Sequence, residues 1–374
     1  MNRFQKIVSI FILTVISIPG IYHISGLKVL NPLKGAYKEA TLPSFKLSSF
    51  NNLEFQENFE KYIEDHIGLR PQIVKLTNQL NYSLFNELNP QGVIVGKENY
   101  LFEVPYLITK AGKDYLGLDS LKRIGADLKW LHQELEKENI HLLVVLAPDK
   151  VTFMPEYLPE KFQNRKEADS TNYKIFAQLL KEDSIQHIDF NPLFLSWKDT
   201  ATYPLYPKYG THWSSYGWYL AADTILKKLG ALSSEKLNSI LVEEIEISSK
   251  LRDTDYDIGE SLNLLCKLPS DPMAYPKLKF ENNYSKPDVL VIGDSYYVNI
   301  ATSDIPEGVF NKHDFLYYNK RVYNNPDKKV NLPEDFKNYN FVIVEATTAN
   351  IRLLNYGLFK NKEIRQQKMK QSGI

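Results

Sequence analysis

Three short, continuous apolar runs constrain the fold of this 374-residue chain most. They are residues 140–147 (IHLLVVLA), 289–292 (VLVI) and 341–344 (FVIV). A strand covered on both faces needs apolar side chains on both, so such runs are typical of a parallel sheet. Amphipathic helical patterns alternate with them, as over 121–135 and 214–229. The sequence therefore predicts an α/β fold: a three-layer α/β/α domain with a mostly parallel sheet.

The N-terminus carries an apolar stretch over residues 7–27, which holds no charge and follows Arg3 and Lys6. A run of about 20 apolar residues is long enough to cross a bilayer as a helix. Basic residues in front of it favour a cytoplasmic start, with the rest of the chain exported. We expect residues 1–30 to be an uncleaved transmembrane anchor, ahead of a cleaved signal sequence and of a buried core helix. Either of the first two places the body in the periplasm, and an anchor holds it at the cell inner membrane.

Composition shifts divide the remainder. Residues 31–56 are rich in Pro, Ser and Asn with little periodicity, which is typical of a linker. The predicted enzyme domain covers 57–355, and the polar, basic stretch 356–374 is predicted to be a solvated tail. Residues 92–102 show a hairpin pattern. Residues 231–285 lack the helix–strand rhythm, and we interpret them as an insertion or an edge hairpin.

Charge and cysteine content exclude several classes of function. Lys and Arg together number 45 and so do Asp and Glu, so the chain lacks the basic surplus that nucleic-acid binding needs. The single cysteine, Cys266, permits no intrachain disulfide and no cysteine-based metal site. Residues 253–260 are acidic but lack the glutamate at the twelfth position of an EF-hand loop, so we interpret them as a polar turn. No phosphate-binding glycine loop is present. We predict neither a metal nor a cofactor.

The apolar run 289–292 leads directly into Gly293-Asp294-Ser295. Open parallel sheets bind ligands at the carboxyl ends of their strands, so Ser295 is a candidate nucleophile there. The backbone N–H groups of Ser295 and Tyr296 are the natural oxyanion donors. Asp294 is expected to be structural, because neighbours on a strand-to-helix turn point in different directions. The alternative for the whole motif is an ordinary helix cap after a strand.

Of the seven histidines, only His212 lies in a turn rich in Gly, Thr, Trp and Ser, residues 209–215 (YGTHWSS). A serine needs a base to become a nucleophile, and histidine is the usual base near neutral pH. His212 is therefore the candidate base for Ser295. The alternative is a hydrogen-bonded structural histidine.

Together these motifs resemble the SGNH/GDSL hydrolases, and among them the alginate O-acetyltransferases of the AlgJ/AlgX type. In that branch the catalytic Asp and His come from an Asp-x-His-Trp turn, and the serine follows later. Four further stretches resemble the family in the same order: 62–70 (YIEDHIGLR), 92–102 (GVIVGKENYLF), 147–150 (APDK) and 157–159 (YLP).

The resemblance implies O-acetyl transfer to an exported polysaccharide, with Ser295 as nucleophile and His212 as base. It also implies that a membrane-bound O-acyltransferase supplies the acetyl groups. Two alternatives remain open. One is an esterase or deacetylase that uses the same residues with water as acceptor. The other is a non-catalytic glycan-binding assembly protein of the same fold.

One departure from the family matters, because the family's Asp would fall on Gly210, which has no side chain. An orienting carboxylate fixes the histidine tautomer and stabilises the imidazolium. Asp149, Asp294 and Asp199 are substitutes by proximity to the motifs only. Otherwise a Ser–His dyad operates or the protein is not catalytic.

Four more residues are candidates for substrate binding. Arg321 would bind an anionic sugar or shape the cleft, and Lys150 follows a buried strand that could bring it to the site. Trp213 and Tyr209 flank the histidine turn, and either could stack on a pyranose ring. The alternatives are a solvated arginine and aromatic rings that only pack the turn.

Overall fold

The computed structural model describes residues 3–27, 32–35, 39–88, 92–163, 168–323, 325, 327–332 and 334–358. The chain forms two compact units. The N-terminal unit consists of Met1–Gln91 and Ile258–Leu268, and the sheet unit of Gly92–Asp257 and Pro269–Ile374. Residues 57–91, which the sequence assigned to the enzyme domain, therefore cluster with the N-terminal helices.

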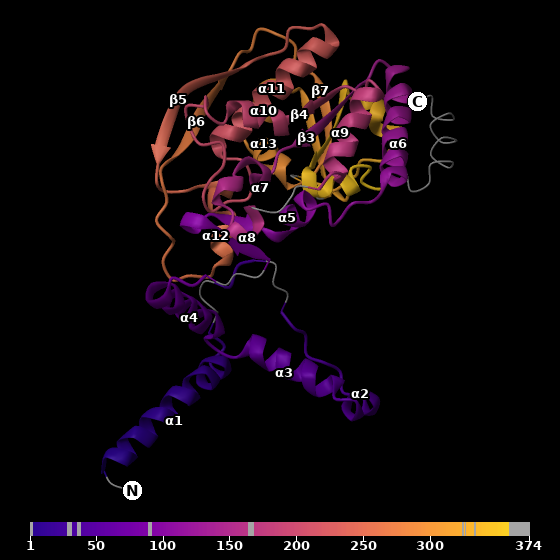
Figure 1. Ribbon diagram of the computed structural model, residues 1–374. Coiled ribbons are helices and arrows are strands. Elements are labelled where there is room, and N and C mark those ends of the chain that lie inside the picture. Colours follow the sequence, from indigo (N-terminus) through magenta and orange to yellow (C-terminus); the bar gives the residue numbers. More distant parts are fainter. Residues whose placement is uncertain are drawn as a thin grey trace. The chain divides into compact units, whose positions relative to one another are not determined.

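The N-terminal unit is helical, with α1 (Arg3–Ile24), α2 (Leu47–Asn51), α3 (Glu54–His66) and α4 (Arg70–Phe85) (Figure 1). Among the described helices, α1 alone is long and apolar enough to cross a membrane; it has 22 residues and a mean hydropathy of 2.1. A signal sequence has the same properties. The predicted linker contains α2 and the first turn of α3.

The sheet unit is built on six strands in the order β4-β3-β10-β7-β8-β9. All neighbours pair in parallel except β8 and β9, which are antiparallel. The strand bounds are β3 (His141–Ala147), β4 (His187–Asp189), β7 (Asp288–Gly293), β8 (Lys312–Tyr317), β9 (Arg321–Val322) and β10 (Phe341–Thr347). The three apolar runs are β3, β7 and β10, and these neighbours form the sheet centre, as the sequence predicted.

Helices cover both faces of this sheet, which confirms the predicted three layers (Figure 1). One face carries α6 (Leu118–Glu136) and α9 (Asn172–Glu182). The other carries α10 (Phe190–Trp197), α11 (Ser215–Ser233) and α13 (Val298–Thr302). Side chains of each central strand alternate between the two cores, since successive residues of a strand point to opposite faces.

Shorter elements complete the unit. Strands β5 (Ile240–Ser248) and β6 (Met273–Phe280), within 231–285, form a separate two-stranded antiparallel sheet and pair with no described strand of the central sheet. A hairpin joins β1 (Val93–Val95) to β2 (Leu101–Glu103). The remaining helices and 3₁₀ turns of this unit are η1 (Lys97–Asn99), α5 (Val104–Lys110), α7 (Lys150–Phe153), η2 (Pro155–Tyr157), α8 (Glu160–Gln163), η3 (Asp253–Tyr256), η4 (Ser295–Tyr297), α14 (Ile305–Val309), η5 (Glu334–Asn338) and η6 (Thr348–Leu353). Helix α12 (Asp257–Ser261) begins at the last residue of the segment Gly92–Asp257, and its other residues belong to the N-terminal unit.

The predicted solvated tail, 356–374, is wrong at its start. Tyr356 and Leu358 are buried in the core, and the Tyr356 hydroxyl donates to the Glu345 carbonyl oxygen at 2.7 Å. Burying the aromatic ring and the leucine side chain removes apolar surface from water, which lowers the free energy of the folded state relative to a solvated tail. Residues 359–374 lie outside the described residues.

Candidate active site

Strand β7 ends at Gly293, and the turn after it places Ser295 at the carboxyl edge of the sheet. Asp294 caps η4, since its Oδ1 accepts the Tyr296 N–H at 3.0 Å. Its Oδ2 accepts from the Thr347 N–H at 2.9 Å and from Asn350 Nδ2 at 2.8 Å. Asp294 is thus a fully buried scaffold of the nucleophile turn, as expected from sequence, and not the group that orients the histidine.

The histidine turn brings His212 onto this serine. The Nε2 atom of His212 lies 2.9 Å from Ser295 Oγ, across 83 positions of sequence. Two hydrogen bonds join the turns: Trp213 Nε1 donates to the Tyr296 carbonyl at 3.1 Å, and the Tyr296 hydroxyl donates to the Thr211 carbonyl at 2.8 Å. The imidazole is held where a general base for Ser295 has to be.

The orienting carboxylate comes from Asp257, which no sequence argument identified. Its Oδ2 lies 2.5 Å from His212 Nδ1, and its Oδ1 accepts the Thr211 N–H at 2.9 Å. Asp257 belongs to the acidic segment 253–260, which the sequence analysis set aside as a polar turn. Among the described residues, the hydrogen-bond partners of the His212 ring are Asp257 and Ser295, and not Asp149, Asp294 or Asp199, the substitutes that the sequence suggested.

The Asp257 loop also explains the glycine in the histidine turn. A Cβ atom on Gly210 would overlap the Thr254 carbonyl oxygen and lie 2.7 Å from Pro207 Cγ. The loop therefore fills the space beside residue 210 that a side chain would need. The carboxylate expected at 210 from the family pattern is absent, and the segment that excludes it supplies another.

Two further bonds hold this loop in place. Asn299 Nδ2 donates to Thr254 Oγ1 at 2.6 Å, which ties the loop to α13. Asp255 is buried and accepts the Ser215 backbone N–H at the start of α11. Burial raises the pKa of Asp255 to about 7, while a hydrogen bond from Tyr275 opposes the rise. Both helices that carry the histidine and serine turns are therefore bonded to the loop.

Charge in the site favours a protonated histidine. Burial by itself lowers the pKa of His212, but the hydrogen bond and charge of Asp257 and the charge of Glu103 raise it above its ordinary value. Glu103, at the end of β2, is a second residue that sequence reasoning missed. Burial raises the pKa of Glu103, and a hydrogen bond from Thr211 opposes the rise. The site stabilises an imidazolium once His212 takes a proton.

Lys150 lies beneath the histidine turn, not in a cleft, which corrects the substrate-binding prediction. Its side chain is 1% exposed, and Nζ donates to the carbonyl oxygens of Lys208 at 2.8 Å and Gly210 at 2.9 Å. Burial lowers the pKa of Lys150 to about 7, against the charges of Asp257 and Glu103. Lys150 therefore supports the turn from inside.

The two aromatic candidates also face inward, so of the two roles considered for them, stacking on a sugar or packing the turn, the structure supports packing. Trp213 is 1% exposed and packs against Phe190, Phe194 and Tyr296. Tyr209 is 2% exposed, and its hydroxyl donates to the Pro269 carbonyl at 2.9 Å. Neither ring face is open to a sugar. Large rings beside a turn exclude water from the hydrogen bonds that shape it.

Two predicted orienting residues have other roles. Asp149 caps α7 by accepting the Thr152 N–H at 2.7 Å, and its other oxygen accepts from Thr348 Oγ1 at 2.9 Å. Burial raises the pKa of Asp149. Asp199 is exposed in the turn after α10. Both residues are near the motifs in sequence, but neither carboxylate is hydrogen-bonded to His212 in the structure.

The two predicted oxyanion donors differ in whether their N–H group already has an acceptor. The Tyr296 N–H is occupied by Asp294 Oδ1. The Ser295 N–H has no acceptor within the part of the chain that the structure describes. Arg321 is exposed on β9 and pairs with Tyr317 of β8. On the other side of β8, Tyr317 pairs with Gly293, the last residue of β7. Arg321 therefore lies at the same sheet edge as the serine turn.

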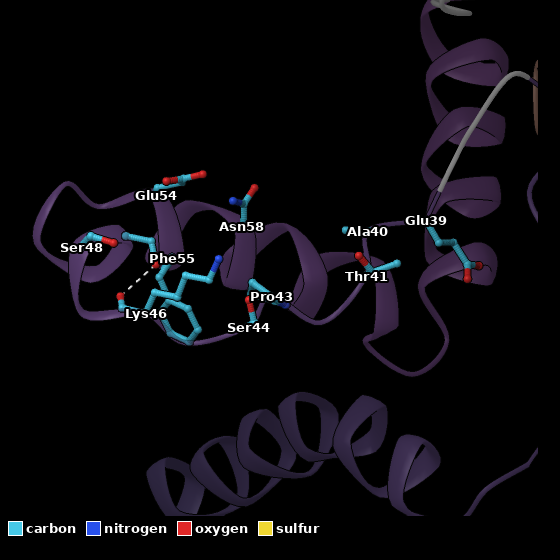
Figure 2. Close-up of a pocket in the computed structure, with 11 residues that line it drawn as sticks. Glu39, Ala40, Thr41, Pro43, Ser44, Lys46, Ser48, Glu54, Phe55 and Asn58 are labelled. Atoms are coloured by element: carbon cyan, nitrogen blue, oxygen red, sulfur yellow. Dashed lines mark hydrogen bonds between the residues drawn. The ribbon is translucent and has the colours of Figure 1, made fainter.

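A pocket of about 690 Å³ lies elsewhere, within the N-terminal unit (Figure 2). Its lining runs from Glu39 to Asn58 and includes Lys46, Glu54 and Phe55. The described residues that line it include Ser44 and Ser48 and no histidine (Figure 2).

Part of the chain is similar to a known protein family. Residues 93–255 match the family model of the SGNH hydrolase-like domain of the acetyltransferase AlgX. This segment contains His212 but ends before Asp257 and Ser295. None of the curated proteins matches the chain significantly.

Three solved structures are similar to it. The O-acetyltransferase domain of Pseudomonas putida AlgJ is 16% identical, with a TM-score of 0.47 over 70% of this chain and 92% of that one. Pseudomonas aeruginosa AlgX is 16% identical, with a TM-score of 0.42 over 72% and 67%. Bacillus cereus PatB1 is 13% identical, with a TM-score of 0.45 over 69% and 96%. Residues 93–255 are thus similar to an SGNH hydrolase-like acetyltransferase domain, in agreement with the resemblance that the motifs show.

Proposed function

We propose that this protein is an O-acetyltransferase that modifies an exported polysaccharide through an acyl-enzyme on Ser295. The observation that carries the proposal is the unbroken chain Ser295 Oγ, His212 Nε2, His212 Nδ1 and Asp257 Oδ2. A serine, a base within hydrogen-bond reach and a carboxylate behind that base are the groups that nucleophilic acyl transfer needs. The acetyltransferase family model supports the choice of acyl group.

The proposed reaction has two halves. His212 Nε2 takes the Ser295 proton as Oγ attacks the acyl carbonyl, and it returns that proton to the departing group. A sugar hydroxyl then attacks the acyl-enzyme, gives its proton to His212, and leaves as the acetyl ester while Ser295 regains a proton. Asp257 stabilises the imidazolium in both halves. The Ser295 N–H is available to the oxyanion.

The proposed setting is outside the cytoplasm. Helix α1 would anchor the chain in the inner membrane, with the sheet unit in the periplasm. A membrane-bound O-acyltransferase would deliver the acetyl groups there. The main argument for a non-catalytic relative was the missing carboxylate at Gly210, and Asp257 removes it.

The test is intact-mass spectrometry of the full chain in detergent, with an activated acetyl ester and, separately, a serine-directed phosphonate. A single adduct on Ser295 is expected, absent in Ser295→Ala and strongly slowed in His212→Ala. Ser196→Ala, at an exposed serine on α10, is the matched control and should label normally. An adduct that persists in Ser295→Ala would refute the assignment. Adding a glycan acceptor distinguishes acetyl transfer from hydrolysis by the product formed.

A further inference from the structure

A second buried carboxyl group lies directly behind the nucleophile turn. Glu345 is on the central strand β10 and is 1% exposed, and the neighbouring Asp294 is 0% exposed. Glu345 Oε2 accepts the Asp294 backbone N–H at 3.0 Å. Two carboxyl groups thus share a buried site next to Ser295, and neither takes part in the proposed proton transfer.

The glycine before the turn makes this approach possible. A Cβ atom at position 293 would lie 2.6 Å from Glu345 Oε2 and 3.2 Å from Glu345 Cβ. Those distances are too short for any larger residue unless Glu345 moves. The absence of a side chain at Gly293 therefore leaves the space that the Glu345 side chain occupies.

The hydrogen bonds of the two carboxyl groups indicate which of them carries a proton. Asp294 accepts from the Tyr296 N–H, from the Thr347 N–H and hydroxyl, and from Asn350. Glu345 Oε1 is buried and has no donor among the described residues. Its side chain is within hydrogen-bond reach of the Asp294 carboxyl group. Two carboxylates cannot bond to each other without a proton, whereas a neutral Glu345 acid can donate to Asp294.

The surroundings agree with a neutral acid. Among the described residues, the other titratable groups on which the charge of Glu345 acts are the phenols of Tyr297, Tyr318 and Tyr356, and none of them is a cation. Burial and the charge of Asp294 raise the pKa of Glu345 well above its ordinary value.

We propose that Glu345 is a positioning residue, a neutral carboxylic acid that accepts the Asp294 N–H, donates to the Asp294 carboxylate and so fixes the turn presenting Ser295. The inference rests on the proposed function, because it concerns how that nucleophile is held. A neutral acid serves here better than a carboxylate, since it supplies a donor and an acceptor without a second buried negative charge.

Substitutions separate this role from simple packing. Glu345→Gln keeps one donor, one acceptor and the shape, so Ser295 labelling by the phosphonate should stay within about threefold of wild type. Glu345→Ala leaves the Asp294 N–H unpaired and should slow labelling about tenfold to a hundredfold. Val344→Ala, a buried neighbour on the same strand, should lower the melting temperature without slowing labelling. Equal losses in Glu345→Gln and Glu345→Ala, or no loss in Glu345→Ala, would overturn the proposal.

Two measurements do not depend on catalysis or on the alanine variant folding. The infrared band of a protonated carboxyl group should be present in wild type at pH 8 and absent in Glu345→Gln. The folded state keeps a proton that the unfolded chain loses, so the wild-type unfolding constant should rise with pH, by up to about tenfold per unit, relative to Glu345→Gln.

A missing band, or parallel pH profiles for the two proteins, would refute the neutral acid. A band without any Ser295 adduct in wild type would instead contradict the proposed function.

Discussion

The carboxylate of Asp257 lies 2.5 Å from His212 Nδ1, although 45 positions separate the two residues in sequence. The family pattern places this carboxylate two residues before the histidine, where this chain has Gly210. The loop that carries Asp257 crosses that glycine so closely that a side chain there would collide with Thr254. The same interaction is thus made from another segment of the chain.

Asp257→Asn should reduce Ser295 labelling and acyl transfer by about 10³ to 10⁴, in line with the loss of a triad carboxylate elsewhere. The Asn oxygen can still accept the Thr211 N–H. Its NH₂ group would then face His212 Nδ1 and favour the wrong tautomer. The measurement is the rate of phosphonate labelling. Asp253→Asn in the same loop is the control and should be unchanged; activity of Asp257→Asn within threefold of wild type would contradict the orienting role.

Gly210→Ala should destabilise the protein by about 2–4 kcal/mol, because the new Cβ meets backbone that cannot move aside. Gly125→Ala is a matched control in α6, where the nearest atom to an added Cβ is 3.8 Å away. It should be neutral or stabilise by up to about 1 kcal/mol through helix propensity. Thermal or urea unfolding of both variants tests the contrast. Equal stability of Gly210→Ala and wild type would show that the Asp257 loop does not pack as described.

Lys150→Met should flatten the pH dependence of stability above neutral pH. The pKa of Lys150 is lowered to about 7 in the folded state from 10.5, so between these values the unfolded chain holds a proton that the folded protein has released. The wild-type free energy of unfolding should therefore rise with pH relative to Lys150→Met, by up to about 1.4 kcal/mol per pH unit.

Denaturant unfolding at several pH values between 7 and 10 measures this difference. Lys129→Met, at a surface ion pair, should run parallel to wild type. A parallel profile for Lys150→Met would mean that the buried amine titrates normally.

Arg321→Gln should raise KM for an anionic acceptor by about tenfold, the effect of losing one charge-assisted contact. The side chain is exposed, so stability should change by less than about 0.5 kcal/mol. Phosphonate labelling of Ser295 should be unaffected, because Arg321 does not contact the serine. Lys329→Gln, another exposed cation, is the control. An unchanged KM for the charged acceptor would remove Arg321 from the proposed acceptor site.

Local patterns predicted much of this molecule. Continuous apolar runs identified β3, β7 and β10, because a strand covered on both faces must be apolar at every position. Turn motifs identified Ser295 and His212, since each follows from residues adjacent in sequence. Both predictions use information that lies within a few positions of the residue concerned.

Other features depend on distance in space, which the sequence did not display. Trp213 and Tyr209 flank the histidine, but side-chain direction put both rings in the core. Lys150 follows a buried strand, yet its amine bonds to turn carbonyls rather than to solvent or substrate. The direction of a side chain depends on which elements pack against it, and those come from distant segments.

The sequence by itself determined the parallel α/β sheet, the helices on its two faces, the apolar N-terminal helix and the serine–histidine pair. Only the tertiary structure decided that Asp257 orients His212, that Glu103 and Lys150 surround the turn, and that Glu345 stands behind Ser295. The physical reason is that apolar periodicity and turn chemistry act between neighbours along the chain. Hydrogen bonds between buried carboxyl groups and their partners join atoms that only folding brings within about 3 Å.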